Sequence, residues 1–106
     1  MSIVKEKLHI LLIRENASKT FIAKLLGIPY HALFRKLNED RFTNNEILKI
    51  ANHYGYEVQI IISEAGGSRI VLRMPESNEV FSPDRMSEIL GLEVDITFKK
   101  VNAKGI

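Results

Sequence analysis

The sequence predicts an α+β fold, in which an N-terminal half of about four helices is followed by a small β-β-α-β segment. Apolar residues recur at helical spacing up to residue 54, and beyond Gly55 they alternate with polar residues as in strands. The charge balance changes at the same place, from nine Lys/Arg against five Asp/Glu in residues 1–53 to six against eight in residues 54–106. We therefore expect two units, residues 1–55 and residues 56–106, of which the first suits an anionic partner.

The first helix is expected over residues 2–14, with an apolar stripe on its inner side. The members of this stripe are Val4, Leu8, Leu11 and Leu12. A second side is made apolar by Ile3, Ile10 and Ile13, so that the helix has little polar surface. We interpret this second side as part of a deeper core, and the alternative is burial at a subunit interface.

The stretch KTFIAKLLGIPYHALFRKLN at residues 19–38 has the spacing of a helix-turn-helix. Two helices that cross steeply need a small residue where they touch, which suits Ala23, and a residue that tolerates positive φ between them, which suits Gly27. Ser18 is expected to cap the first helix. The second helix is expected over residues 29–38, beginning with Pro29, and such a helix fits the major groove of DNA.

A fourth helix is expected over residues 44–54. Thr43 and Glu46 have the spacing of a capping box, in which each side chain accepts a free backbone N–H group of the other residue. An apolar face then begins at Ile47, and Gly55 is a natural stop.

The second half is expected to form a hairpin, a short helix and a last strand. The turn sequence EAGGS separates the first two strands, and Ser82 with Pro83 marks the start of the helix. Met86, Ile89 and Leu90 are expected to face the sheet. The expected ranges are strands at 56–63 and 69–74, a helix at 82–91, a strand at 93–99 and a frayed tail at 101–106.

From about residue 4 to residue 62 the chain resembles the lambda-repressor-like (Xre-type) helix-turn-helix family, especially short phage and plasmid regulators. The motifs LLGIPYHALFRKLN and FTNNEILKIANHYGY carry this resemblance, which covers a little over half of the chain. It implies a sequence-specific double-stranded DNA-binding transcriptional regulator, expected to be a repressor, with residues 29–38 in the major groove. Two positions depart from the family pattern, because Lys19 stands where many members have Gln and Pro29 where a Ser often caps the recognition helix.

The candidate DNA contacts lie on and around the predicted recognition helix. Arg35 is expected to donate two hydrogen bonds to the O6 and N7 atoms of a guanine, and Lys36 and Arg41 are expected to contact phosphates. Tyr30 is expected to touch a thymine methyl or a phosphate, with core packing as the alternative, whereas Phe34 is expected to help the core. The full set is Lys19, Thr20, Tyr30, His31, Arg35, Lys36, Asn38 and Arg41.

The apolar face of the predicted sheet is the candidate surface for a homodimer, because a segment of this size makes a thin core. The alternative is a monomer whose sheet packs on its own helices. The residues of this face are Val58, Ile60, Ile62, Ile70, Leu72, Val94, Ile96 and Phe98.

A rival function is a mobile-element protein-interaction module of the antitoxin or phage-inhibitor type. In such a protein the C-terminal half binds another protein while the helix-turn-helix regulates its own gene. The acidic residues of the second half keep this alternative open, because an acidic face would suit a basic partner.

Composition argues against several other classes. The sequence has no cysteine, which excludes disulfides and thiol catalysis. Asp84 and Glu88 lie four residues apart but have no neighbouring nucleophile or metal-ligand motif, and capping and solvation explain them. We expect no enzyme activity, cofactor or metal. The apolar runs are too short for a membrane span and the N-terminus lacks a secretory pattern, so we expect a cytoplasmic protein.

Overall fold

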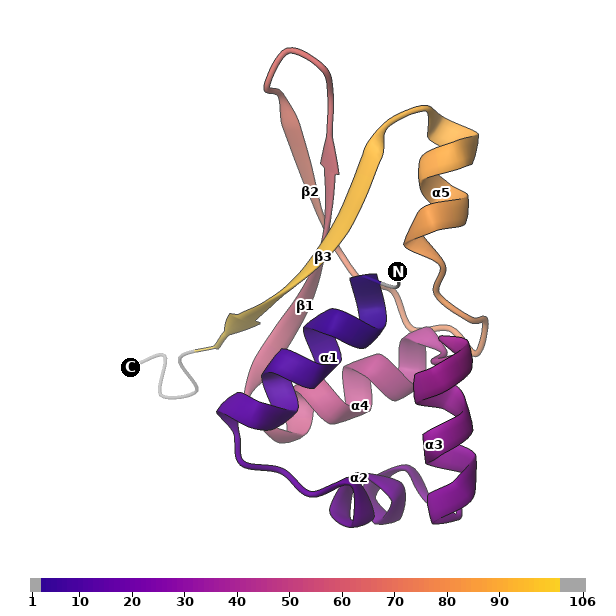
Figure 1. Cartoon of the computed structure of the whole chain (residues 1–106). Coiled ribbons are helices and arrows are strands. Elements are labelled where there is room, and N and C mark those ends of the chain that lie inside the picture. Colours follow the sequence, from indigo (N-terminus) through magenta and orange to yellow (C-terminus); the bar gives the residue numbers. More distant parts are fainter. Residues whose placement is uncertain (1–2, 102–106) are drawn as a thin grey trace.

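The computed structural model describes residues 3–101, which form five helices and three strands. The four helices of the first half form a lower body, and the sheet rises from it with α5 at its side (Figure 1). This arrangement confirms the predicted α+β class and the β-β-α-β order of the second half. The elements are α1 (Ile3–Arg14), α2 (Lys19–Leu26), α3 (Tyr30–Glu39), α4 (Asn44–His53), β1 (Tyr56–Ser63), β2 (Arg69–Arg73), α5 (Pro83–Leu90) and β3 (Glu93–Lys100).

Two expectations fall partly outside the described residues. Residue 2, where we expected the first helix to begin, is one of them, and residues 102–106 of the expected frayed tail are the others. Val101 is described and is not frayed, because its backbone N–H donates to the Gly55 carbonyl at 2.8 Å.

The three strands form one antiparallel sheet in the order β2-β1-β3. On β1, Ile60 stands opposite Leu72 of β2 and Ile96 of β3, so these three residues share one face of the sheet. The even-numbered residues of β1 are buried and the odd-numbered ones are half-buried. The alternation is the predicted one, but the apolar side of β1 faces the helices of the same chain, which is the arrangement that we gave as the alternative to a dimer surface.

The helices and the sheet share a hydrophobic core. The packing joins α4 to β1 and α1 to β3, so that the sheet lies on its own helices. The most deeply buried large side chains come from both halves of the chain: Leu8, Leu11, Ile22, Leu33, Phe42, Ile47, Ile50, Val58, Val94 and Ile96. The core is thus continuous across the two halves of the chain.

Two predictions about burial are wrong in part. On the second apolar side of α1, Ile3 packs against the core, but Ile10 and Ile13 are exposed. On α5, Met86 packs against the core, but Ile89 and Leu90 are exposed. The physical reason is that α5 packs mainly on β3, so the side of the helix that carries Ile89 and Leu90 stays exposed among the described residues.

The N-terminus of α4 is held by the segment between β2 and α5. The backbone N–H of Asn44 donates to the Glu79 carbonyl at 3.1 Å, and that of Asn45 donates to the Ser77 carbonyl at 2.9 Å. The side-chain amide of Asn44 donates to the Pro75 carbonyl at 3.1 Å. The side-chain oxygen of Asn45, Oδ1, accepts from the Ser77 backbone N–H at 2.8 Å. We call residues 75–81 the connector. It supplies acceptors to N–H groups that a helix end leaves unpaired.

Asn45→Ala should lower the free energy of unfolding by about 1–2 kcal/mol, because it removes the bond to Ser77 and a bond from the Asn45 amide to Asn78 Oδ1 at 2.8 Å. Urea unfolding of both forms measures this difference. Asn78→Ala is the matched control, since it removes only the second bond and should cost less. Equal stability of Asn45→Ala and the unmodified protein would show that the Asn45 side chain does not help the connector to hold α4.

Candidate nucleic-acid interface

A tight turn joins α2 to α3. Gly27 adopts a φ of 70°, a left-handed conformation that suits glycine and that the sequence predicted. The Gly27 N–H donates to the Lys24 carbonyl and the Ile28 N–H donates to the Ala23 carbonyl, which closes the end of α2. Ala23 is buried, as expected for the small residue at the crossing. The turn therefore fixes the direction in which α3 leaves α2.

The helix α3 begins one residue later than predicted. Pro29 is its N-cap, with extended dihedrals and no side-chain cap, and the first helical residue is Tyr30. The Pro29 carbonyl accepts from the N–H groups of Ala32 and Leu33 at 3.0 and 3.2 Å. At the other end, Asp40 takes a left-handed conformation and stops the helix after Glu39.

The outer side of α3 carries two exposed aromatic residues. Tyr30 is 50% exposed and Phe34 is 46% exposed, while Leu33 and Leu37 point into the core. Phe34 was expected in the core, and this expectation is wrong. Because each helical residue is turned by about 100° from the last, the position after buried Leu33 faces outward. A shallow hollow of about 410 Å³ lies on this side of α3, lined by Tyr30, His31, Phe34, Arg35, Asn38 and Glu39.

Two arginines at the end of α3 share one carboxylate. Arg35 Nε lies 3.3 Å from one oxygen of Glu39, and Arg41 Nε lies 3.5 Å from the other. Both arginine side chains are largely exposed, so these pairs are screened by water and contribute little to stability. Either guanidinium can exchange Glu39 for another anion at small cost.

The environment of Lys36 differs from that of the two arginines, because its ion pair is half-buried. Its Nζ lies 3.1 Å from Glu46 Oε1, and the exposed fractions of the two side chains are 25% and 19%. The same oxygen accepts the Thr43 N–H at 3.0 Å, which completes the predicted capping box of α4. Lys36 thus joins α3 to the N-terminus of α4, and its amine is not directed at the outer side of α3.

The start of α2 lies beside the outer side of α3. Lys19 Nζ lies 5.1 Å from the centre of the Phe34 ring, a cation–π distance. Thr20 is exposed, as are His31, Asn38 and Arg41. The structure therefore gathers Lys19, Thr20, Tyr30, His31, Phe34, Arg35, Asn38 and Arg41 around α3, and it uses Lys36 elsewhere.

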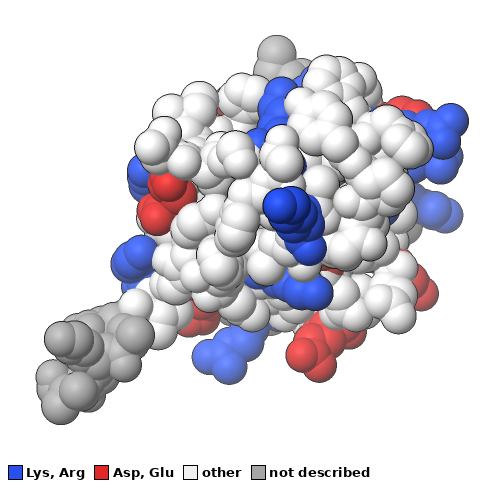
Figure 2. All heavy atoms as spheres, turned by 90° about the horizontal axis from the view of Figure 1, so that it is seen from below, with Lys and Arg blue, Asp and Glu red and all other residues white. Residues whose placement is uncertain are grey.

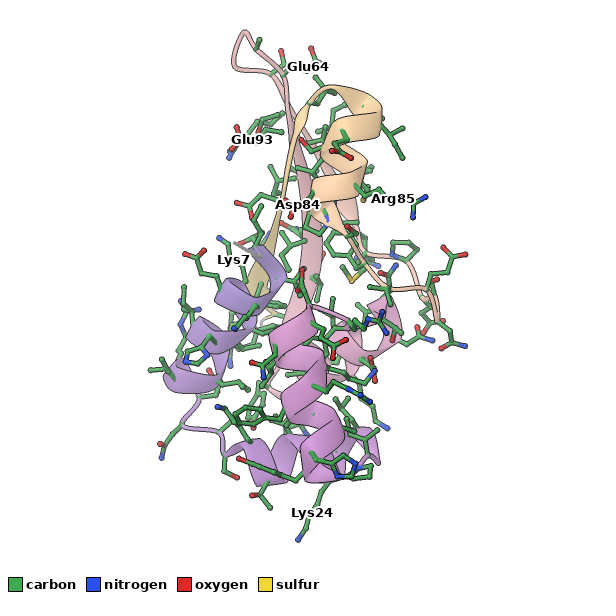
Figure 3. The ribbon with its side chains drawn as sticks, turned by 45° about the vertical axis from the view of Figure 1, so that its right-hand side comes forward. Lys7, Lys24, Glu64, Asp84, Arg85 and Glu93 are labelled. Carbon is green, nitrogen blue, oxygen red and sulfur yellow. The ribbon has the colours of Figure 1, made fainter. Side chains whose placement is uncertain are left out.

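The charges are spread unevenly over the molecule. Seen from below, where the helical body lies, Lys and Arg side chains stand apart on a largely uncharged surface, with Asp and Glu toward its rim (Figure 2). Lys24 points away from α2 at this lower end, whereas Glu64 and Glu93 lie at the far end of the sheet (Figure 3). An anion approaching from below meets these separate cations.

The sheet residues that we predicted for dimerisation fall into two groups. Val58, Ile60, Ile62, Val94 and Ile96 are buried in the core of this chain, and Phe98 is half-buried. Ile70 and Leu72 are 45% and 46% exposed, and Val71 between them is 50% exposed. The apolar surface that the sheet leaves open is therefore β2, all five residues of which are exposed.

Among residues 3–101, no strand pairs with the outer edge of β2. Bonds from the Glu64 N–H to the Ser68 carbonyl and from the Met74 N–H to the Val58 carbonyl flank the pairing with β1. Because hydrogen-bonded pairs alternate in an antiparallel ladder, the even-numbered residues of β2 bond to β1. The backbone groups of Arg69, Val71 and Arg73 consequently point outward.

The edge of β3 is better protected. The Ile96 N–H, which faces away from β1, donates to Asp95 Oδ1 at 2.7 Å, and Lys7 of α1 lies 3.8 Å from the other Asp95 oxygen. A side-chain cap and a neighbouring helix are two of the ways in which proteins block an edge strand. Of the two edges, β2 is the one open to an added strand.

Comparisons of the chain with protein-family models, with curated proteins and with solved structures found no match.

Within residues 3–101 no helix has both the length and the apolar character needed to cross a membrane. The same residues contain no group of three or more His, Cys, Asp or Glu that could hold a metal ion. Burial is the main cause that raises the pKa of the Tyr54 hydroxyl, and the Glu15 carboxylate is the second cause.

Lys36→Met and Glu46→Gln should each lower the free energy of unfolding by about 1 kcal/mol, since both break a half-buried ion pair between α3 and α4. The double variant should lose less than the sum, and a double-mutant cycle in urea measures this coupling. Arg35→Met is the matched control, because its pair with Glu39 is exposed and should be worth under about 0.5 kcal/mol. A Lys36→Met variant as stable as Arg35→Met would contradict the role assigned to Lys36.

Proposed function

We propose that the protein is a sequence-specific double-stranded DNA-binding transcriptional regulator, most simply a repressor, that works in the cytoplasm with α3 in the major groove. The observation that carries the proposal is the tight α2–α3 turn, which leaves one full side of α3 exposed and surrounded by cations. The sequence resemblance to lambda-repressor-like (Xre-type) regulators of phages and plasmids supports it.

Each exposed group has a role in this proposal. Lys19, Thr20 and Arg41 lie at the borders of α3 and contact phosphates, which set the position of the protein on the duplex. Arg35 leaves Glu39 and donates to the O6 and N7 atoms of a guanine. His31 and Asn38 contact neighbouring bases or phosphates. Repression follows from occupancy, because a protein seated on the groove excludes other proteins from the same site.

The protein acts as a homodimer through the open edge of β2, because regulators of this class bind sites with two-fold symmetry. Antiparallel pairing of β2 with its copy extends each sheet and covers Ile70 and Leu72. A register centred on Val71 would set Arg69 opposite Arg73 of the partner subunit, where the like charges repel. Centring the pair on Ile70 or Leu72 avoids this repulsion, and we favour those registers.

The same edge supports the second candidate, a module that binds another protein. Arg69 and Arg73 flank Val71 on one face of β2, and Arg73 Nε lies 3.7 Å from Glu57 Oε1. At this edge we therefore favour an extended acidic segment added as a strand, in place of the basic partner that the acidic residues of the second half suggest. In that case the helix-turn-helix would still control the gene of the protein itself, and β2 would be occupied by a foreign chain. The oligomeric state separates the two candidates.

The protein should bind duplex DNA at low salt and retard it in a gel, with an affinity that is roughly micromolar or weaker and that falls as the salt concentration rises.

On a duplex selected from a random library, Arg35→Ala should weaken binding by ~1–3 kcal/mol and relax the preference at one base pair. Arg41→Ala should weaken selected and scrambled duplexes alike and lower the salt dependence. Fluorescence anisotropy titrations of both variants test these outcomes, and the absence of any DNA binding at low salt would refute the regulator.

Val71→Pro should convert a dimer at tens of micromolar into a monomer, because proline removes an N–H group that points outward from β2. Val71→Thr is the matched control, since it keeps that N–H and should remain dimeric. Light scattering gives the solution mass, and circular dichroism confirms that both variants fold. An unmodified protein that is monomeric and still binds its operator tightly would exclude the dimer and favour a foreign partner at β2.

A further inference from the structure

Tyr30 and Phe34 form an apolar stripe on the outer side of α3. They are four residues apart, so they lie one above the other on the helix. Their ring centres are 6.3 Å apart with the planes tilted by 43°, and about half of each side chain is exposed. Two adjacent aromatic rings on an exposed helix face lose favourable apolar burial unless something covers them.

The charges around the stripe indicate what kind of ligand packs on the two rings. Lys19 lies over the Phe34 ring, and His31 and Arg35 lie on the same outer side of α3. The hollow beside the stripe is lined by one acidic side chain, Glu39, which Arg35 and Arg41 share. An apolar centre with a basic border fits a ligand that has an anionic frame and apolar groups within it.

The major groove of DNA has this combination. Phosphates line both of its sides, and the apolar group on the base edges within it is the 5-methyl group of thymine. Four helical residues advance by about 6 Å, and successive base pairs are about 3.4 Å apart. The rings of Tyr30 and Phe34 therefore span about two base-pair steps.

We propose that Tyr30 and Phe34 determine part of the sequence specificity by packing on the 5-methyl groups of two thymines that lie about two base-pair steps apart. This inference rests on the proposed DNA-binding function and adds the chemistry of the bases that are recognised. Lys19 keeps Phe34 in place through its contact with the ring while its amine remains near a phosphate. The tyrosine hydroxyl is free to meet water or the backbone of the duplex.

Replacing thymine by uracil removes the methyl group and leaves base pairing intact, so it tests the proposal without altering the protein. A duplex selected from a random library is resynthesised with uracil at one thymine at a time, and each form is titrated. One or two positions in each half-site should lose affinity by roughly 4-fold per methyl group. Tolerance of uracil at every position, with tight binding retained, would overturn this inference and leave the proposed function standing.

A matched set of variants assigns the effect to residues. Phe34→Ala should bind the thymine duplex more weakly and should no longer respond to uracil at its position. Tyr30→Phe keeps the ring and should retain its uracil response. Phe21→Ala removes an exposed ring of α2 that packs against His53 at 5.1 Å, and its uracil response should match that of the unmodified protein. A Phe34→Ala variant that stays as sensitive as the unmodified protein contradicts the assignment, and failure to select any duplex refutes the proposed function itself.

Discussion

The carboxylate of Glu46 is the point at which three parts of the chain meet. One of its oxygens accepts the N–H of Thr43 in the loop and the amine of Lys36 from α3, while the residue itself belongs to the first turn of α4. The connector completes this junction from the other side, through Asn44 and Asn45. Since α4 also packs against β1, the orientation of α3 relative to the sheet depends on this small polar junction.

The sequence predicts the elements of the fold well because their signals are local. The capping box of Thr43 and Glu46, the left-handed Gly27 and the change of period at Gly55 each depend on a few neighbouring residues. Burial depends on which elements become neighbours, and periodicity does not carry that information. Ile13 and Ile89 have the spacing of core residues, yet each faces a direction in which no other element lies.

The candidate site was predicted in part. The exposed side of α3 follows from the helix-turn-helix spacing, so Tyr30, His31 and Arg35 were found in advance. Phe34 was missed because a large aromatic side chain next to Leu33 suggests a core position. A lysine on a helix is ordinarily expected to be exposed, so the sequence suggests a free cation at Lys36. Its ion pair with Glu46 joins residues ten apart across a loop, and a helical pattern cannot reveal such a pair. The hydrogen bonds of the connector span more than thirty residues and have no signal in the sequence.

The connector also has a consequence for how the protein is made. A chain leaves the ribosome from its N-terminus, so α1 to α4 emerge well before residues 75–81. Until then the first turn of α4 lacks the acceptors that Ser77 and Glu79 later provide, and β1 lacks both of its neighbours. Contacts between segments so distant along the chain slow folding, because a long loop must close before they form. The nascent helical body therefore reaches its final form only after residues 75–81 and β3 have emerged to complete it.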